Sequence, residues 1–307
     1  EKANGYIEYA TQAPLQNSTL FELASVSKQF TAMTIMMLQE KGLLHYDDLV
    51  EQYIDIPYKN ITIRQLLTHT SGLPDYQAIM DEHWDKSKVA NNNDIISYLN
   101  KYAPPKLFEP GTQYLYSNTG YVILASITEK VSGRDFIEFC TNEIFHPLKM
   151  KNTAIRTLEQ KAAIKNFALG HIFIPEKNEY VRADSFPSSN YTIWLGNRKG
   201  PGRISSTVED LLKWDQALYS DKLIQPTTLA QAFTPMTLTT GKISNYGFGW
   251  ELIPQDNIVW HNGDNPGYKT IIVRFLENKA TLIILCNNAS DAFENLTSDL
   301  KKLIQGH

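Results

Sequence analysis

The sequence predicts a mixed α/β (α+β) protein in which an antiparallel sheet is flanked by helices and interrupted by an inserted all-helical region. Four apolar, strand-like segments with short turns between them fill residues 246–288, a spacing typical of antiparallel neighbours. Another strand-like segment lies at residues 5–10, and helical patterns dominate the stretch between. Because one strand is not stable alone, we expect residues 5–10 to pair with the C-terminal strands.

The helices are predicted from apolar periodicity and from their end signals. They are expected at residues 25–41, 63–67, 121–131, 134–145, 205–219 and 291–304. Gly42 follows the first of them as a helix-terminating residue, and Thr62 can cap the second. The helix at 205–219 has Ser and Thr before it and acidic residues in its first turn.

This order of elements predicts how the chain is organised. We expect residues 1–45 and 240–307 to form the α/β sheet region, residues 46–239 to form a mostly helical region, and the active site to lie between them. The length of 307 residues is enough for one large domain or two interleaved ones, each with a substantial core.

Composition excludes several classes of function. Net charge is -4 and the basic residues form no cluster longer than Arg198-Lys199, which argues against a nucleic-acid partner. No apolar run approaches the ~20 residues of a transmembrane helix. The seven histidines lack metal-ligand spacing, so no metal site is expected. No organic cofactor is expected either.

Ser25 and Lys28 form a Ser-x-x-Lys pair at the start of the first predicted helix. Residues three apart share a helix face, so the two side chains can form a hydrogen bond. A buried lysine with a lowered pKa can act as the base that a serine nucleophile needs. The alternative is a capping serine followed by a solvated lysine. The same spacing at Ser298 and Lys301, in the last helix, fits only the polar face of that helix.

Two other short motifs are candidates for the same site. Tyr116-Ser117-Asn118 lies in a loop before a helix, where a phenol can transfer a proton and an amide can hold a substrate; the alternative is a helix cap beside a packed tyrosine. His261-Asn262-Gly263 ends a strand-like run. Its imidazole could direct a polar or cationic group at the nucleophile, and Gly263 could let a substrate backbone approach. The alternative is a histidine at a hairpin turn.

Six segments in order resemble the β-lactamase-related serine hydrolases. They are SVSKQFTAMTIMMLQEKGLL, ITIRQLLTHTSGLPDY, FEPGTQYLYSNTGYVILASITEKVSG, ISSTVEDLLKWDQAL, YGFGWEL and HNGDNPGY. The family includes class C β-lactamases, penicillin-binding proteins with D-alanyl-D-alanine carboxypeptidase activity, esterases and D-amino-acid amidases. The resemblance covers nearly the whole chain and implies a β-lactamase/transpeptidase-like fold.

The resemblance also implies catalytic roles for three residues. Ser25 matches the acylated nucleophile, and Lys28 matches the lysine that activates it. Tyr116 matches the tyrosine of the family's YxN motif. The resemblance implies that this tyrosine is a general base for acylation and for activating the deacylating water.

Substrate-binding roles are implied in the same way. Asn118 matches the asparagine that contacts the substrate amide and the lysine. His261 takes the place of the lysine in the third motif, as in many penicillin-binding-protein-like and esterase members, and Gly263 matches its glycine. The backbone N–H groups of Ser25 and Asp264 would form the oxyanion hole.

The sequence departs from the family pattern in two informative places. The third motif is His-Asn-Gly rather than Lys-Thr-Gly, which disfavours an efficient class C β-lactamase. Relatives often carry a Gly-x-Gly-Gly stretch where this chain has Gly202-Arg203. Arg203 has two interpretations, of which we favour a surface salt bridge over a pocket residue that binds a carboxylate.

The expected function is a serine hydrolase that acts through an acyl-enzyme on a D-amino-acid amide, a β-lactam or an ester. A promiscuous carboxylesterase of the same fold and a catalytically inactive binding or sensory relative are the alternatives. The substrate would be a small molecule or a D-Ala-D-Ala-type peptide. Since relatives that act on the cell wall are exported, a periplasmic or extracytoplasmic location is expected.

Overall fold

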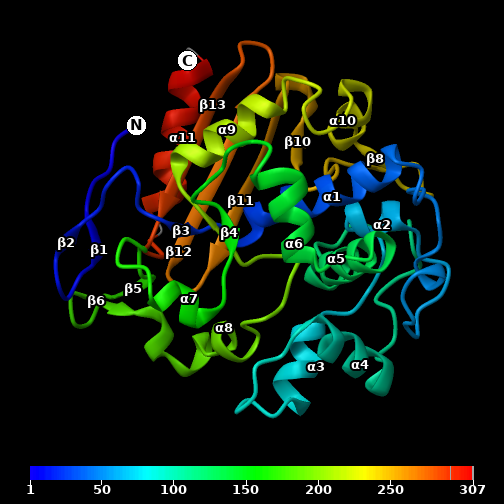
Figure 1. Ribbon diagram of the computed structural model, residues 1–307, viewed down its shortest axis with the longest axis horizontal. Coiled ribbons are helices and arrows are strands. Elements are labelled where there is room, and N and C mark those ends of the chain that lie inside the picture. Colours follow the sequence, from blue (N-terminus) through cyan, green and yellow to red (C-terminus); the bar gives the residue numbers. More distant parts are fainter. Residues whose placement is uncertain (291, 306–307) are drawn as a thin grey trace.

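The computed structural model describes residues 1–290 and 292–305. Within this part of the chain, the largest sheet has the strand order β10 (Glu251–Ile253), β11 (Ile258–Asn265), β12 (Tyr268–Phe275) and β13 (Ala280–Cys286). Each strand pairs antiparallel with the next along the chain, and Figure 1 shows them side by side. The antiparallel arrangement expected for the four C-terminal segments is therefore confirmed.

The two faces of this sheet pack against different helices. Ile271, Val273 and Phe275 pack with Phe293 of the last helix, α11 (Ala292–Gln305). The alternate residues of β12 face the opposite way: Ile272 joins the main core, and Arg274 contacts helix α9 (Val208–Ala217). The period of two in the strand thus separates an α11 face from a face that carries α9 and the main helical core.

The first strand does not join this sheet, so that prediction was wrong. Among the described residues, β1 (Tyr6–Glu8) pairs with β2 (Ala13–Pro14) in a local hairpin, visible at the edge of the molecule in Figure 1. The intervening turn contains Gln12 with a φ of 52°, which reverses the chain before it can reach the sheet. Asn287, just after β13, makes the connection instead by donating its side-chain amide to the carbonyls of Tyr6 and Ile7, both at 3.1 Å.

Helices and short strands fill the middle of the chain. The helices are α1 (Lys28–Glu40), α2 (Ile63–Leu67), α3 (Tyr76–His83), α4 (Asn92–Tyr102), α5 (Asn118–Ser132), α6 (Phe136–Cys140), α7 (Leu158–Ala162), α8 (Tyr191–Trp194) and α10 (Pro226–Ala232). The short strands are β3 (Phe21–Glu22), β4 (Ala154–Ile155), β5 (His171–Ile174), β6 (Glu179–Arg182), β7 (Ile204–Ser206), β8 (Met236–Thr237) and β9 (Ile243–Ser244).

Most predicted helices are present, with shifted ends. Thr62 caps α2 through a reciprocal capping box with Gln65, as expected. Helix α5 begins three residues earlier than predicted because the Ser117 hydroxyl accepts a hydrogen bond from the Gly120 N–H and caps it. Residues 205–206 belong to strand β7, and helix α9 starts after them. Residue 291, where the last helix was expected to begin, lies outside the described residues.

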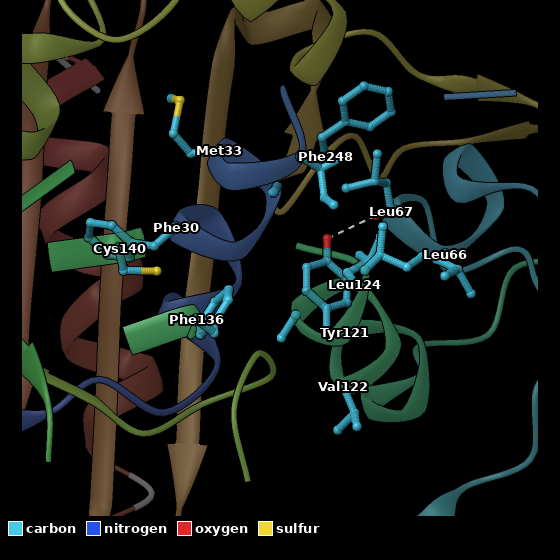
Figure 2. Close-up of a cluster of buried hydrophobic side chains, with 14 of the residues drawn as sticks. Phe30, Met33, Leu66, Leu67, Tyr121, Val122, Leu124, Phe136, Cys140 and Phe248 are labelled. Carbon is cyan, nitrogen blue, oxygen red and sulfur yellow. Dashed lines mark hydrogen bonds between the residues drawn. The ribbon is translucent and has the colours of Figure 1, made fainter. Parts of the chain in front are cut away.

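The helical core lies between α1, α2, α5 and α6. Figure 2 shows Phe30 and Met33 of α1 among side chains from the other three helices. The hydroxyl of Tyr121 on α5 donates to the Leu67 carbonyl at the end of α2, at 2.9 Å. That bond satisfies the phenol in the apolar interior and fixes α5 against α2. In the described part of the chain, no helix is long and apolar enough to cross a membrane.

Candidate active site

Ser25 lies in a one-turn 3-10 helix (Ala24–Ser27) between β3 and α1. Strand β3 pairs with β7, and the Ile204 N–H donates to the Ser27 hydroxyl at 3.3 Å. Ala24 has a φ of 48°, in the left-handed region that a residue with a side chain rarely adopts. The other three residues of this turn are buried, whereas Ser25 is half-buried. The turn therefore leaves Ser25 as its accessible side chain.

Lys28, the first residue of α1, contacts three oxygens with its Nζ. They are the Ser25 hydroxyl at 3.1 Å, the Asn118 Oδ1 at 2.8 Å and the Pro201 carbonyl at 3.0 Å. The Ser-x-x-Lys spacing produces the first contact, because residues three apart lie on one face of the turn. The other two oxygens are acceptors only, so they take two N–H groups of Lys28. The structure thus contradicts a solvated lysine.

The surroundings of Lys28 favour a neutral amine. Its side chain is buried, and among the described residues no carboxylate forms an ion pair with it. Burial, with a smaller contribution from the Arg198 charge, lowers the pKa of Lys28 well below its usual value. In its neutral form, an amine that donates to Asn118 and Pro201 would keep one lone pair, and that lone pair would face the Ser25 hydroxyl.

Tyr116 and Asn118 come together with this pair. Asn118 is the first residue of α5 and holds Lys28 directly. The Tyr116 ring lies 4.7 Å from the Lys28 Nζ. Burial raises the pKa of the Tyr116 phenol, and the nearby Ser25 hydroxyl offsets only part of that rise. The phenol oxygen makes no hydrogen bond of ordinary geometry within the described structure, although it is buried. Tyr116 is therefore a neutral phenol beside Ser25.

His261 lies within β11 and faces the same side of the sheet as the nucleophile's turn. Its neighbour on β12 is Ile272, and the adjacent pair Gly263 and Thr270 contacts that turn. The His261 Nε2 lies 2.9 Å from the Tyr246 hydroxyl. Burial, followed by the charge of Lys28, lowers the pKa of His261 to about 3. Of the two forms expected at this position, polar or cationic, burial thus favours the neutral, polar imidazole.

Gly263 is required for the packing of β11 against the turn that carries Ser25. A Cβ at this position would lie 2.2 Å from the Leu23 carbonyl oxygen and 2.3 Å from the Thr270 hydroxyl. The Thr270 hydroxyl itself donates to the Leu23 carbonyl at 2.8 Å. The missing side chain thus lets β11 dock against the residues just before Ser25; the predicted approach of a substrate at Gly263 stays a prediction.

Replacing Gly263 with alanine should therefore destabilise the protein by about 1–3 kcal/mol, because the two closest atoms, the Leu23 carbonyl oxygen and the Thr270 hydroxyl, are held in place by their own hydrogen bond. The change in unfolding free energy would be measured by urea denaturation. Gly202→Ala is the matched control, since a Cβ there meets nothing closer than the Ala24 carbonyl oxygen at 3.8 Å. Equal stability of the two variants would contradict this role of Gly263.

Asp264 follows Gly263 on a strand edge that is partly open. Strand β10 pairs with β11 only over residues 258–260, so the pairing found in the described residues leaves that edge of 261–265 without a strand partner. The Asp264 side chain forms an exposed ion pair with Lys269, at 2.5 Å, and takes no part in the site. Any role of Asp264 near Ser25 rests on its backbone N–H.

Two residues that enclose the Tyr116 ring, His69 and Tyr246, were not predicted from the sequence. His69 is fully buried, and its Nδ1 accepts a hydrogen bond from the Ser117 N–H at 3.0 Å. Its ring centroid lies 4.2 Å from that of Tyr116 and 4.4 Å from that of Tyr246. The available signal was the run Thr-His-Thr-Ser at residues 68–71, which is polar but lies directly after an apolar helix. His69 and Tyr246 hold the Tyr116 ring in place.

The segment before β7 delivers the Pro201 carbonyl to Lys28. Gly200 has a φ of 109°, and a Cβ there would lie 2.1 Å from the Tyr121 carbonyl oxygen. The Thr31 hydroxyl of α1 donates to the Gly200 carbonyl at 2.7 Å. Arg203, three residues on, is only 4% exposed. The surface salt bridge favoured for Arg203 from the sequence is therefore wrong.

This fold and this group of side chains define a class of protein, the serine hydrolases with a β-lactamase/transpeptidase fold. The chain belongs to the β-lactamase family, whose family model matches residues 1–305. The resemblance noted in the sequence is thus confirmed.

Individual relatives agree with this assignment. Penicillin-binding protein 4* of Bacillus subtilis (strain 168) is 41% identical over 293 residues, which cover 94% of this chain and 65% of that protein. The crystal structure of a penicillin-binding protein from Bacillus halodurans is 25% identical, with a TM-score of 0.84, over 98% of this chain and 91% of that one. A D-amino acid amidase from Ochrobactrum anthropi SV3 shares the fold at 24% identity and a TM-score of 0.78, over 99% of this chain and 89% of that one.

Proposed function

We propose that this chain hydrolyses amide, β-lactam or ester bonds through an acyl-enzyme on Ser25. The observation that carries the proposal is the environment of Lys28, which is buried, unpaired with any carboxylate in the described structure, and 3.1 Å from the Ser25 hydroxyl. A lysine in this state is a base rather than a counter-ion. The similarity to penicillin-binding proteins and a D-amino acid amidase supports the same class of substrates.

Acylation begins when the Ser25 Oγ attacks the substrate carbonyl carbon and transfers its proton to the Lys28 lone pair. The carbonyl oxygen becomes an oxyanion, which the backbone N–H groups of Ser25 and Asp264 would hold. As the intermediate collapses, the bond to the leaving group breaks. The proton passes from Lys28 to the leaving nitrogen or oxygen, with the Tyr116 phenol as the relay, since it lies against both Ser25 and Lys28.

Deacylation repeats these steps with water as the nucleophile. Water attacks the Ser25 ester, its proton goes to Lys28, and the acid is released as Ser25 regains its hydrogen. Asn118 would bind the substrate amide with its free NH₂ group, because its Oδ1 is used by Lys28. Substrates would lie along the open edge of β11. We also propose an extracytoplasmic location, where cell-wall peptides with D-amino-acid amide bonds occur.

Adduct mapping tests this function. The protein would be incubated with a fluorescent penicillin and, separately, with a fluorophosphonate, and the modified residue located by peptide mass spectrometry. We expect a single adduct, on Ser25, with at least one probe. No adduct with either probe, or an adduct elsewhere, would contradict the mechanism.

The chain contains a matched control for this experiment. Ser298 has the same Ser-x-x-Lys spacing but lies exposed on α11. Ser298→Ala should keep wild-type labelling, and Ser25→Ala should lose it. Turnover of nitrocefin, p-nitrophenyl esters, D-amino-acid amides and D-alanyl-D-alanine peptides would then rank the substrate classes.

A further inference from the structure

A cavity of about 320 Å³ lies beside strand β3, which leads into the turn that carries Ser25. Its wall includes Glu22, three residues before Ser25, and Asn265, the residue after Asp264. These two segments carry the backbone N–H groups proposed to hold the oxyanion. Helices α7 and α8, which close the cavity, lie near the end of the main sheet in Figure 1. The cavity is therefore placed to take a group attached to the reacting carbonyl carbon.

Arg203 projects into this cavity without a full set of partners. The Leu23 N–H donates to the Ile204 carbonyl at 2.9 Å, so in this ladder Arg203 lies opposite the residue that precedes Ser25. Its Nη1 donates to the Thr192 carbonyl at 3.2 Å. Its Nε and Nη2 are buried and have no hydrogen-bond partner among the described residues. Buried donors of a charged group are costly to leave unpaired, so these two N–H groups indicate a missing acceptor.

The charges around the cavity also indicate a missing anion. Glu22 and Lys161 are both buried and form an ion pair with each other. The Glu22 carboxylate also attracts the Arg203 guanidinium, but one buried carboxylate then faces two cations, so one positive charge is left in excess. At the rim, Arg182 and Asp184 pair with each other and change the balance little.

The backbone at Arg203 is strained in addition. Its φ of 81° is in the left-handed region, where glycine would be the unstrained choice. A non-glycine residue in such a conformation costs about 1–3 kcal/mol and persists when the surrounding structure holds it there. Strain, burial and unpaired donors at the same side chain are together difficult to explain by stability alone.

We propose that this cavity is an acyl-side subsite in which Arg203 binds a carboxylate, so that the enzyme prefers acyl groups that end in an acid. The preferred class is an ester or amide of a dicarboxylic acid, such as a glutaryl or succinyl derivative. A cavity of this size accommodates a short chain of this kind. The planar guanidinium would donate its Nε and Nη2 hydrogens to the two carboxylate oxygens. This inference rests on the proposed function.

Two p-nitrophenyl esters of matched length test the subsite: the monoester of glutaric acid and the neutral valerate ester. In the wild-type protein the ratio of their kcat/KM values should favour the glutaryl ester by about 10- to 100-fold, the range expected for a charge-assisted hydrogen bond. Arg203→Met should remove this preference, and Arg203→Lys should keep part of it. Arg64→Met is the matched control. It removes an arginine on α2 that pairs with Asp47 at the surface, and it should keep the wild-type ratio.

Arg203→Gly keeps the test decisive if the methionine variant does not fold. Glycine adopts a φ of 81° without strain, so this variant should melt no lower than the wild type while also losing the preference. An unchanged ester ratio in Arg203→Gly, with Ser25 still labelled by the fluorophosphonate, would overturn the subsite and leave the proposed function intact.

The reverse failure is also distinguishable. If no probe acylates Ser25, the proposed function fails, and binding alone decides the subsite. Glutarate should then raise the melting temperature of the wild type more than the uncharged glutaramide does, and the difference should vanish in Arg203→Gly. Equal shifts with glutarate and glutaramide in the wild type would overturn the subsite.

Discussion

Replacing Lys28 with methionine should slow acylation of Ser25 by about 10²- to 10⁴-fold, the usual contribution of a positioned general base. Methionine has a similar length, and it removes both the lone pair that faces Ser25 and the donors to Asn118 and Pro201. The rate would be measured by stopped-flow release of p-nitrophenol or by the rate of labelling with a fluorescent penicillin.

The pH profile identifies which group is the base. Burial lowers the pKa of Lys28, so the wild-type acylation rate should rise with pH as this amine loses its proton. The rise should be absent in Lys28→Met. It should remain in Tyr116→Phe, although that variant is slower, because burial raises the pKa of the Tyr116 phenol and keeps it protonated. A profile that becomes flat in Tyr116→Phe, or that persists in Lys28→Met, would transfer the role of base to another group.

The melting temperature of Lys28→Met shows whether this variant is slow because it lacks the base or because it does not fold. The pKa of Lys28 in the folded protein is below that in the unfolded chain, so the unfolded chain binds the extra proton at pH values between the two pKa values. Lys28 therefore disfavours folding below the unfolded pKa, and its cost decreases as pH rises toward that value. Methionine has no such cost. It does, however, leave the Asn118 Oδ1 and the Pro201 carbonyl without the Lys28 donor. The melting temperature of Lys28→Met relative to that of the wild type should therefore rise as pH falls, because the cost of the buried lysine is largest at low pH.

Replacing Asp215 with alanine should lower the free energy of unfolding by about 3–5 kcal/mol, the usual effect of removing one partner of a buried ion pair. Asp215 on α9 accepts a hydrogen bond from the Arg274 Nε at 2.6 Å, and both side chains are 0% exposed. The Arg274 guanidinium also lies 4.4 Å from the centroid of the Tyr219 ring. Without Asp215, its charge would remain in the interior between α9 and β12 without a carboxylate partner.

Urea denaturation would measure this loss of stability, and two further variants serve as controls. Asp215→Ala combined with Arg274→Met should recover much of the lost stability, because no buried charge remains. Asp47→Ala, which breaks the exposed pair with Arg64, should cost less than about 1 kcal/mol. A cost for Asp215→Ala as small as that for Asp47→Ala would show that the buried pair contributes little.

The parts of the site that sequence predicted best are those that local geometry determines. Ser25 and Lys28 meet because three residues span one helical turn, which is visible in the spacing alone. Asn118 and Tyr116 needed more, since the Tyr-x-Asn pattern also occurs at residues 58–60 and 98–100. The order of six matching segments identified the copy at residues 116–118. Four C-terminal strands followed from their apolar runs and short turns, which limit the possible pairings.

What the sequence did not predict depends on contacts between distant segments. The Pro201 carbonyl has no signature, because any residue supplies a carbonyl. His69 and Tyr246 are identified by the rings that they enclose, and these rings come together only in the folded chain. Arg203 was assigned to the surface because arginines are mostly exposed. The first strand was assigned to the sheet because a turn at Gln12, with its left-handed backbone, was not recognised.

Two of the oxygens that contact Lys28 belong to residues that the ribosome adds long after Lys28 itself. Asn118 is 90 positions away from Lys28, and Pro201 is 173 positions away. Contacts across such separations require the closure of long loops and form late in folding. Until they form, Lys28 is solvated and protonated like any surface lysine, and Ser25 is an unreactive alcohol. On the proposed mechanism, an incompletely folded chain is protected from premature acylation, since Ser25 becomes reactive only when the last of these segments has docked.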